Sequence, residues 1–124
     1  MKKKFKLKAL LIVAIVAMQV CSLNAQTYNA GSGSGTLGIN NTFVGSGAGS
    51  SAKSAMENNA YFGYRSGFRD TIGEFNAFFG SSAGEDNRGS YNTFIGRGAG
   101  FNNTTGFENT FLGWRAGNEQ TTAS

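Results

Sequence analysis

A pair of apolar residues recurs five times along this chain, and each pair lies between an asparagine and a glycine. One threonine or alanine separates the asparagine from the pair, whose first member is phenylalanine or tyrosine in all five copies. Two apolar residues are too few to form the apolar face of a helix, whereas aromatic and branched side chains favour strands. We therefore predict a short β-strand at each pair. The asparagines are Asn41, Asn59, Asn76, Asn92 and Asn109, the first aromatic residues are Phe43, Tyr61, Phe78, Phe94 and Phe111, and the closing glycines are Gly45, Gly63, Gly80, Gly96 and Gly113.

The five segments recur with a nearly constant period. Successive asparagines are 18, 17, 16 and 17 residues apart, and a second glycine follows each closing glycine after four residues. Glycine adopts the positive φ angles of tight corners without a steric penalty. Short strands joined by glycine corners at this period predict an all-β fold, a parallel β-solenoid of about five repeats of 16–18 residues. The second glycines are Gly49, Gly67, Gly84, Gly100 and Gly117.

Equivalent residues of stacked repeats are expected to lie above one another, because neighbouring strands are about 4.8 Å apart. The five asparagines would then form a ladder of side-chain amide hydrogen bonds, and the five aromatic rings would form a stack. We interpret the asparagine, aromatic and glycine positions as scaffold rather than as a binding site. A helical interpretation fails because each glycine inside a helix costs about 1 kcal/mol.

The first 25 residues have the pattern of a signal peptide. Five lysines precede the apolar run 9–18, which is too short to cross a membrane, and Ala25 offers a small residue for cleavage before Gln26. We expect an exported protein, extracellular or on a bacterial cell surface, where it could associate with the outer membrane without a membrane span of its own. The alternative is a lipoprotein in which Cys21 carries the lipid.

The net charge of +4 results from the five lysines of the signal peptide. Without these five lysines the chain has six basic residues against seven acidic ones, so the exported part has a net charge of −1. Nucleic-acid binding requires a basic surface, and we therefore do not expect it.

We divide the chain into three parts. Residues 1–25 are the signal peptide, residues 26–35 are a Gly/Ser-rich flexible linker, and residues 36–124 are the solenoid region. The sequence stops inside a repeat unit, at a place where natural solenoids normally cover their open strand edge. We therefore expect the region 36–124 to be truncated, or to be capped by another subunit.

The sequence offers no catalytic or metal-binding constellation. It has no histidine, the commonest general base and metal ligand, and its single cysteine cannot form a zinc cluster. The seven carboxylates fall at different places in successive units, so stacking does not collect them into a repeated calcium cage. We expect a protein that is not an enzyme and has no catalytic residue, metal site or cofactor.

Two pairs of an aromatic residue and an arginine are the candidate binding residues. Tyr64-Arg65 and Trp114-Arg115 occupy the same place in their units, directly after the closing glycine. An aromatic ring beside a guanidinium can contact a sugar ring or an anionic glycan. The alternative is that both pairs are solvated corner residues.

The Asn-Thr-Phe-Ile-Gly and Ala-Gly sequences resemble repeats in the heads of trimeric autotransporter adhesins. They are more similar still to repeats in secreted, tail-fibre-like proteins of Bacteroidetes, and the resemblance covers about residues 36–124. It implies a trimer of β-rolls that attaches bacteria to surfaces. The repeat unit is longer here than the usual adhesin-head repeat.

We expect a non-catalytic structural or adhesive module in a secreted or cell-surface fibre. The alternative is a carbohydrate-binding module that uses an exposed face of the solenoid, with a surface glycan or host-surface ligand as its partner. Side chains alternate along a strand, so the second apolar residue of each pair should point outward and form an apolar stripe. This stripe predicts a homo-oligomer, and the resemblance favours a trimer.

Signal cleavage makes the first testable prediction. The exported protein is expected to begin at or near Gln26 and to lack Cys21, because the small residue Ala25 ends the cleavage region. The intact mass of the exported protein measures this directly. A mass that includes a diacylated Cys21 would instead establish the lipoprotein.

Overall fold

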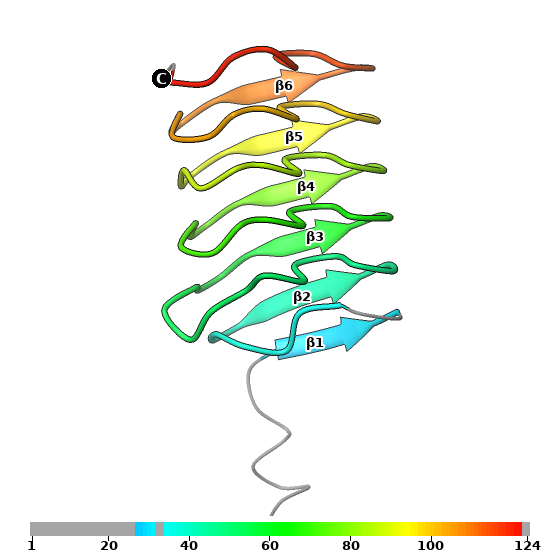
Figure 1. Cartoon of the computed structure of the whole chain (residues 1–124), viewed down its shortest axis with the longest axis vertical. Helices are drawn as coiled ribbons and strands as arrows, with labels where there is room; N and C mark the ends of the chain where they lie inside the picture. The colour runs from blue at the N-terminus through cyan, green and yellow to red at the C-terminus, as the bar shows by residue number, and fades with distance from the viewer. Residues whose placement is uncertain (1–26, 32–33, 123–124) are drawn as a thin grey trace, which may run out of the picture.

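The computed structural model describes residues 27–31 and 34–122, and over these residues it contains six short strands and no helix. The predicted signal peptide 1–25, with its cleavage site and Cys21, lies outside the described residues. Figure 1 shows the strands stacked in chain order along the long axis of the molecule. The strands are β1 (Thr27–Ala30), β2 (Asn41–Val44), β3 (Ala60–Phe62), β4 (Ala77–Phe79), β5 (Thr93–Ile95) and β6 (Thr110–Leu112).

All six strands belong to one parallel sheet, in which each strand pairs with the next one along the chain. The chain returns through turns between successive strands, so each repeat unit forms one coil of a solenoid (Figure 1). The register places identical repeat positions side by side, for example Phe78 beside Phe94. The predicted all-β fold and parallel β-solenoid are therefore confirmed.

Strand β1 lies inside residues 26–35, where the sequence pattern predicted a flexible linker. Four residues of this segment instead pair with β2, with Thr27 aligned to Asn41 and Ala30 aligned to Val44. The segment has no apolar pair, so the pattern that marks the other strands does not reveal it. Its backbone nevertheless follows the repeat, because Gly31 has a φ of 128°, close to the 130° of the corner glycine Gly45.

The core of the solenoid is a column of stacked aromatic rings. The inward residue of each strand from β2 to β6 lies on the equivalent ring of the next coil, with ring centroids 4.7–5.1 Å apart. The first four rings are fully buried and the last is partly buried. The other buried residues of the core are Ala48, Ala52, Met56, Ala83 and Ala99. The interior is therefore about one ring wide.

The second glycine of each unit permits this narrow core. Gly84 has a φ of 57°, in the left-handed region, and a Cβ built on it would collide with the ring of Phe78. Gly67, Gly100 and Gly117 have the same conformation and would collide with the rings of their own units. A residue without a side chain thus turns the chain and lets the backbone pass directly over the ring.

The asparagine side chains of the ladder hydrogen-bond mainly to main-chain groups of the next coil, and not mainly to one another as the sequence predicted. The Oδ1 atom of each asparagine accepts the main-chain N–H of the next, as from Asn76 to Asn59 at 2.9 Å. Its Nδ2 atom donates to the carbonyl oxygen three residues before that next asparagine, as from Asn59 to Gly73 at 2.8 Å. The side-chain amide of Asn59 also donates to the side-chain oxygen of Asn41, at 3.1 Å. Buried amides thus satisfy the backbone groups where each coil begins.

The ring and glycine contact makes the second prediction. Gly84→Ala should lower the free energy of unfolding by about 2–4 kcal/mol, because overpacking costs about 1–3 kcal/mol and a Cβ in the left-handed region about 1 more. Gly98→Ala is the matched control, since its φ is 67° but its Cβ would meet no atom closer than 3.5 Å. It should cost about 1 kcal/mol. Urea titrations of both variants measure the difference, and equal losses would contradict the role given to the ring.

Candidate functional site

On the outer face of the sheet, each strand from β2 to β6 carries a threonine or alanine before its inward ring and an apolar residue after it. The residues on either side of each inward ring point outward, and none of these ten positions holds a charged residue. Phe79 and Ile95 are each 42% exposed and Leu112 is 74% exposed. Phe62 and Phe79 stack on one another at 4.8 Å. The outer apolar stripe is defined as Val44, Phe62, Phe79, Ile95 and Leu112.

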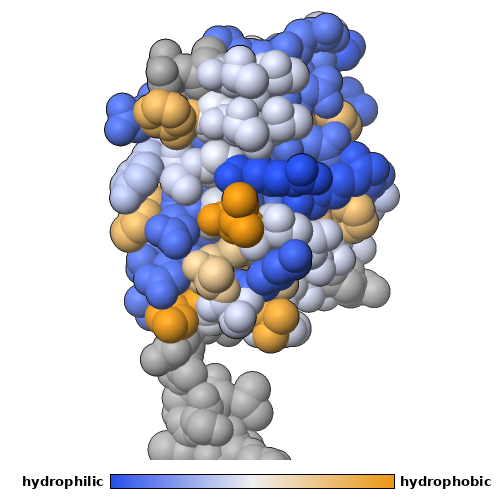
Figure 2. All heavy atoms as spheres, turned by 60° about the vertical axis from the view of Figure 1, so that its left-hand side comes forward, coloured by the Kyte–Doolittle hydropathy of each residue, from blue (hydrophilic) through white to orange (hydrophobic). Residues whose placement is uncertain are grey.

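The stripe differs from the side of the molecule that Figure 2 brings forward. There, apolar residues stand in separate patches between polar ones. Apolar residues scattered singly are usual on any soluble protein, whereas a continuous apolar surface marks an interaction site. The stripe is therefore the first candidate surface.

A second column of buried polar residues runs inside the solenoid. Asp70, Asn87 and Asn103 lie eleven residues after the ladder asparagines of their units, and all three are fully buried. Asn87 donates to Asp70 at 3.0 Å, and Asn103 donates to Asn87 at 2.8 Å. The sequence analysis did not single out this column, although the constant offset from the ladder asparagine was a signal that could have revealed it.

Asp70 lies at the start of this column and, with Glu85, is one of two buried carboxylates among the described residues. Its oxygens accept hydrogen bonds from the Tyr61 hydroxyl at 2.7 Å and from the main-chain N–H groups of Gly73 at 2.7 Å and Ile72 at 3.2 Å. Burial raises the pKa of Asp70, and these hydrogen bonds oppose that rise. Burial, followed by the charge of Asp70, raises the pKa of Tyr61 well above its usual value.

Tyr61 and Asp70 are paired departures from the repeat. Their equivalents in the next two units are phenylalanine and asparagine, namely Phe78 with Asn87 and Phe94 with Asn103. The hydroxyl of Tyr61 donates a hydrogen bond to the carboxylate of Asp70, so each of the two buried polar groups provides a hydrogen-bond partner for the other. Both side chains are fully buried, so this pair serves the scaffold rather than a substrate.

The two predicted glycan-binding pairs, Tyr64-Arg65 and Trp114-Arg115, differ in their contacts with the rest of the solenoid. Tyr64 is 57% exposed, but the guanidinium of Arg65 stacks on Phe68 at 4.4 Å and pairs with Glu85 at 2.6 Å. Its contacts within the solenoid therefore occupy this arginine. Tyr64 follows β3 and Trp114 follows β6, so two further strands separate the pairs and one ligand residue does not contact both.

The second pair is open to solvent. Trp114 is 69% exposed, and the guanidinium of Arg115 lies 5.7 Å from the centroid of its ring. Arg115 forms no ion pair with any of the described residues. The structure thus keeps Trp114 and Arg115 accessible, in contrast to Arg65.

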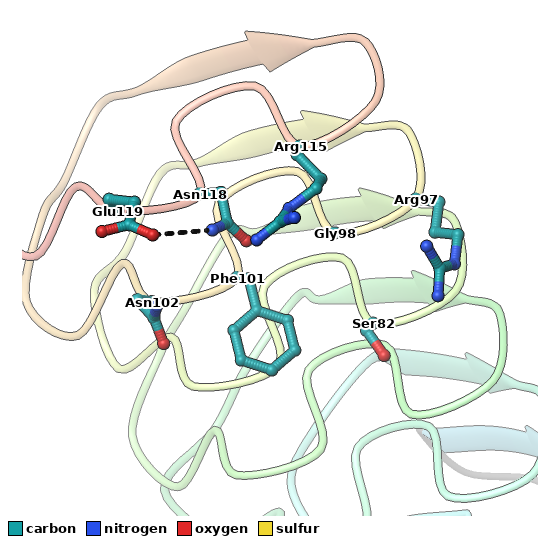
Figure 3. A pocket seen from close by; sticks show the side chains of 8 residues that line it. All are labelled: Ser82, Arg97, Gly98, Phe101, Asn102, Arg115, Asn118 and Glu119. Atoms are coloured by element: carbon teal, nitrogen blue, oxygen red, sulfur yellow. Dashed lines mark hydrogen bonds between the residues drawn. The ribbon is translucent and has the colours of Figure 1, made fainter.

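Arg115 also borders a surface hollow of about 320 Å³ among the turns that follow β4, β5 and β6 (Figure 3). Its other borders are polar side chains and one aromatic ring. The residue two positions after the closing glycine differs in size between units, which explains the hollow. In the Asn59 unit this residue is Arg65, a large side chain, whereas in the next two units it is Ser82 and Gly98, which leave the space open. The lining residues are Ser82, Arg97, Gly98, Phe101, Asn102, Arg115, Asn118 and Glu119.

Other chemistry finds no support in the part of the chain that the structure describes. Over residues 27–31 and 34–122, no three residues among aspartate, glutamate and cysteine gather as metal ligands would. Within the same ranges, no helix is both long and apolar enough to span a bilayer.

The Tyr61 and Asp70 pair makes the third prediction. The double variant Tyr61→Phe with Asp70→Asn recreates the Phe78 and Asn87 pair, so it should be more stable than either single variant. The two substitutions should show a coupling of about 1–3 kcal/mol in a double-mutant cycle. Unfolding titrations of all four proteins measure it, and additive losses would contradict the pairing.

The same variants test the pH dependence. Because the folded-state pKa of Asp70 is raised, its contribution to stability is fully present below the unfolded value of about 4 and is lost as pH rises through the folded-state pKa. The difference in unfolding free energy between the wild-type protein and the double variant should therefore change over this window in the direction that disfavours the wild type at higher pH.

A scan against protein-family models and searches of curated proteins and of solved structures find no match to this chain.

Proposed function

We propose that this chain is a non-catalytic structural and adhesive module of a secreted or cell-surface fibre. The observation that carries the proposal is the outer apolar stripe, which repeats once per coil on a rigid solenoid. A surface with the same residue type at every coil suits a contact that extends along the axis. The signal-peptide pattern and the resemblance to adhesin heads and tail-fibre-like proteins support an exported role.

The chemistry of the interior supports a structural role. The buried asparagines bond to main-chain groups of neighbouring coils, and Asp70 accepts four hydrogen bonds inside the fold. These polar groups stabilise the stack of coils and do not line the hollow.

We further propose that the stripe is the contact between copies of the chain. Phe79, Ile95 and Leu112 expose a large part of their apolar surface, and burying them against identical stripes would remove it from water. Equal spacing of the coils lets two copies align in register along their whole length. The stripe supports an oligomer, and the resemblance favours three copies.

A carbohydrate-binding module is the second candidate function. The hollow bordered by Arg115, together with the exposed ring of Trp114, favours it. This function is compatible with the first, because the hollow and the stripe are formed by different residues.

The stripe makes the fourth prediction. Light scattering of the exported protein at micromolar concentration should give the mass of a trimer, whereas a variant with both Phe62→Ser and Phe79→Ser should give a monomer. Phe107→Ser is the matched control, since Phe107 is 50% exposed but lies outside the stripe, and it should leave the trimer intact. The circular dichroism spectrum checks that each variant keeps its strands.

Each result bears on a different part of the proposal. A monomeric wild-type protein would contradict the role of the stripe, and a dimer would contradict the trimer that the resemblance implies. Beads coated with the exported protein should attach to polysaccharide or protein surfaces under flow, and those coated with the double variant should attach less. Equal attachment of wild-type, variant and uncoated beads would contradict the adhesive role.

A further inference from the structure

The hollow beside β5 and β6 combines cationic, aromatic and neutral polar groups in one place. Its volume of about 320 Å³ falls at the lower end of the range for small-molecule sites. Figure 3 shows the side chains of Arg115 and Asn118 directed toward each other above the ring of Phe101, with Arg97 on the far side. A ligand in the hollow would therefore meet all three kinds of group.

The two arginines of the hollow have no carboxylate partner. Among the described residues the ion pairs join Arg65 to Glu85 and Arg69 to Asp86, and none includes Arg97 or Arg115. The main chains of the two arginines are held together, because the N–H of Arg115 donates to the carbonyl of Arg97 at 2.9 Å. Two guanidinium groups without an ion pair on adjacent coils favour an anion such as a carboxylate or phosphate.

The face of Phe101 is open for a related reason. Its equivalent in the Asn59 unit, Phe68, is covered by the guanidinium of Arg65 at 4.4 Å. In the unit of Phe101 the residue equivalent to Arg65 is Gly98, so no arginine of its own unit covers the ring. A half-buried aromatic face bordering a hollow suits the apolar face of a sugar ring.

The remaining lining groups suit hydroxyl groups. Asn102 and Asn118 can both donate and accept, Ser82 carries a hydroxyl, and Glu119 can only accept when ionised. The Glu119 carboxylate would repel a densely charged anion such as a polyphosphate, but it accepts hydrogen bonds from a sugar. The lining residues as a set could therefore bind one anionic group and several hydroxyl groups of a ligand.

We propose that this hollow binds an acidic sugar residue, a hexuronate of a polysaccharide. Its carboxylate pairs with Arg115, its apolar face lies on Phe101, and its hydroxyls bond to Asn118 and Glu119. Main-chain hydrogen bonds between coils hold the walls in place, as from Gly98 to Ser81 at 2.9 Å and from Asn102 to Asn118 at 3.2 Å. The site is preformed, which lowers the entropic cost of binding.

This proposal deepens the adhesive function by naming the ligand class, and its test is separate from that of the fibre. Soluble oligosaccharides and the full chain measure binding without any need for attachment to a surface. If sugar binding fails while the trimer and bead attachment remain, only the ligand proposal is wrong. If the trimer fails while the sugar binds, only the stripe proposal is wrong.

The experiment is calorimetric titration of the full chain with uronate oligomers. The probes are short oligomers of galacturonate, of alginate and of a glucuronate-containing glycan, and the matched probe is the methyl ester of the galacturonate oligomer. The ester keeps the ring and its hydroxyls but removes the negative charge. At least one uronate oligomer should bind in saturable fashion, and its esterified form should bind about tenfold more weakly or worse.

Three variants locate the binding. Arg115→Gln should weaken binding of the uronate oligomer about tenfold, because it removes one charged contact. Gly98→Asn should also weaken it by filling the hollow, since asparagine tolerates the φ of 67° at this position. Arg88→Gln removes an exposed arginine outside the hollow and should leave the affinity within about twofold.

The remaining outcomes overturn the proposal. Absence of binding to every uronate oligomer, or equal binding of acid and ester, would contradict the arginine and carboxylate contact. Equal binding of poly-glutamate would show an unspecific response to anions instead of recognition of a sugar. Equal effects of Arg88→Gln and Arg115→Gln would place the binding outside the hollow.

Discussion

The match between two distances governs this structure. Parallel strands hydrogen-bond about 4.8 Å apart, and flat aromatic rings stack at nearly the same spacing, as the centroid distance of 4.8 Å between Phe78 and Phe94 illustrates. The backbone ladder and the ring column can therefore share one axial repeat without strain in either. Any change that moves one ring disturbs the coils on both sides, so the glycine facing each ring and the small residues beside it are constrained by the same spacing.

The same narrowness explains the polar interior. In a coil this narrow, regular strands cannot pair every main-chain group, because three or four strand residues alternate with ten or more residues in turns. Buried amides of asparagine replace the missing ladder bonds at the start of each coil. Hydrogen bonds to buried groups are costly to lose, so these polar positions contribute to the choice of a single register as well as to stability.

The repeat was predictable because local and long-range signals coincide in it. An aromatic pair followed by glycine specifies a strand and a corner, and the constant period places equivalent residues in register. Strand β1 escaped prediction because Asn29 occupies the place that Phe43 holds in the next strand. It pairs through backbone hydrogen bonds, which depend little on the identity of the side chain, so no sequence signal marked it.

The site was less predictable than the fold. Tyr64-Arg65 and Trp114-Arg115 look equivalent in sequence, yet Arg65 meets Glu85 of the following unit and Arg115 does not meet a carboxylate. That difference depends on contacts between units and not on the pair itself. The hollow is still harder to foresee, because it results from side chains that are small or missing at Ser82 and Gly98 while their neighbours remain large.

The inner polar column also gives the solenoid a direction. Asp70 accepts from Asn87 and Asn87 accepts from Asn103, in both cases from the following coil. The Oδ1 atom of Asn103 is buried without a hydrogen-bond partner among the described residues. The hydrogen bonds of this column therefore all run the same way, from the side-chain amide of the later coil to the side-chain oxygen of the earlier one. The two ends of the column are not equivalent, because an unfilled acceptor remains at its C-terminal end.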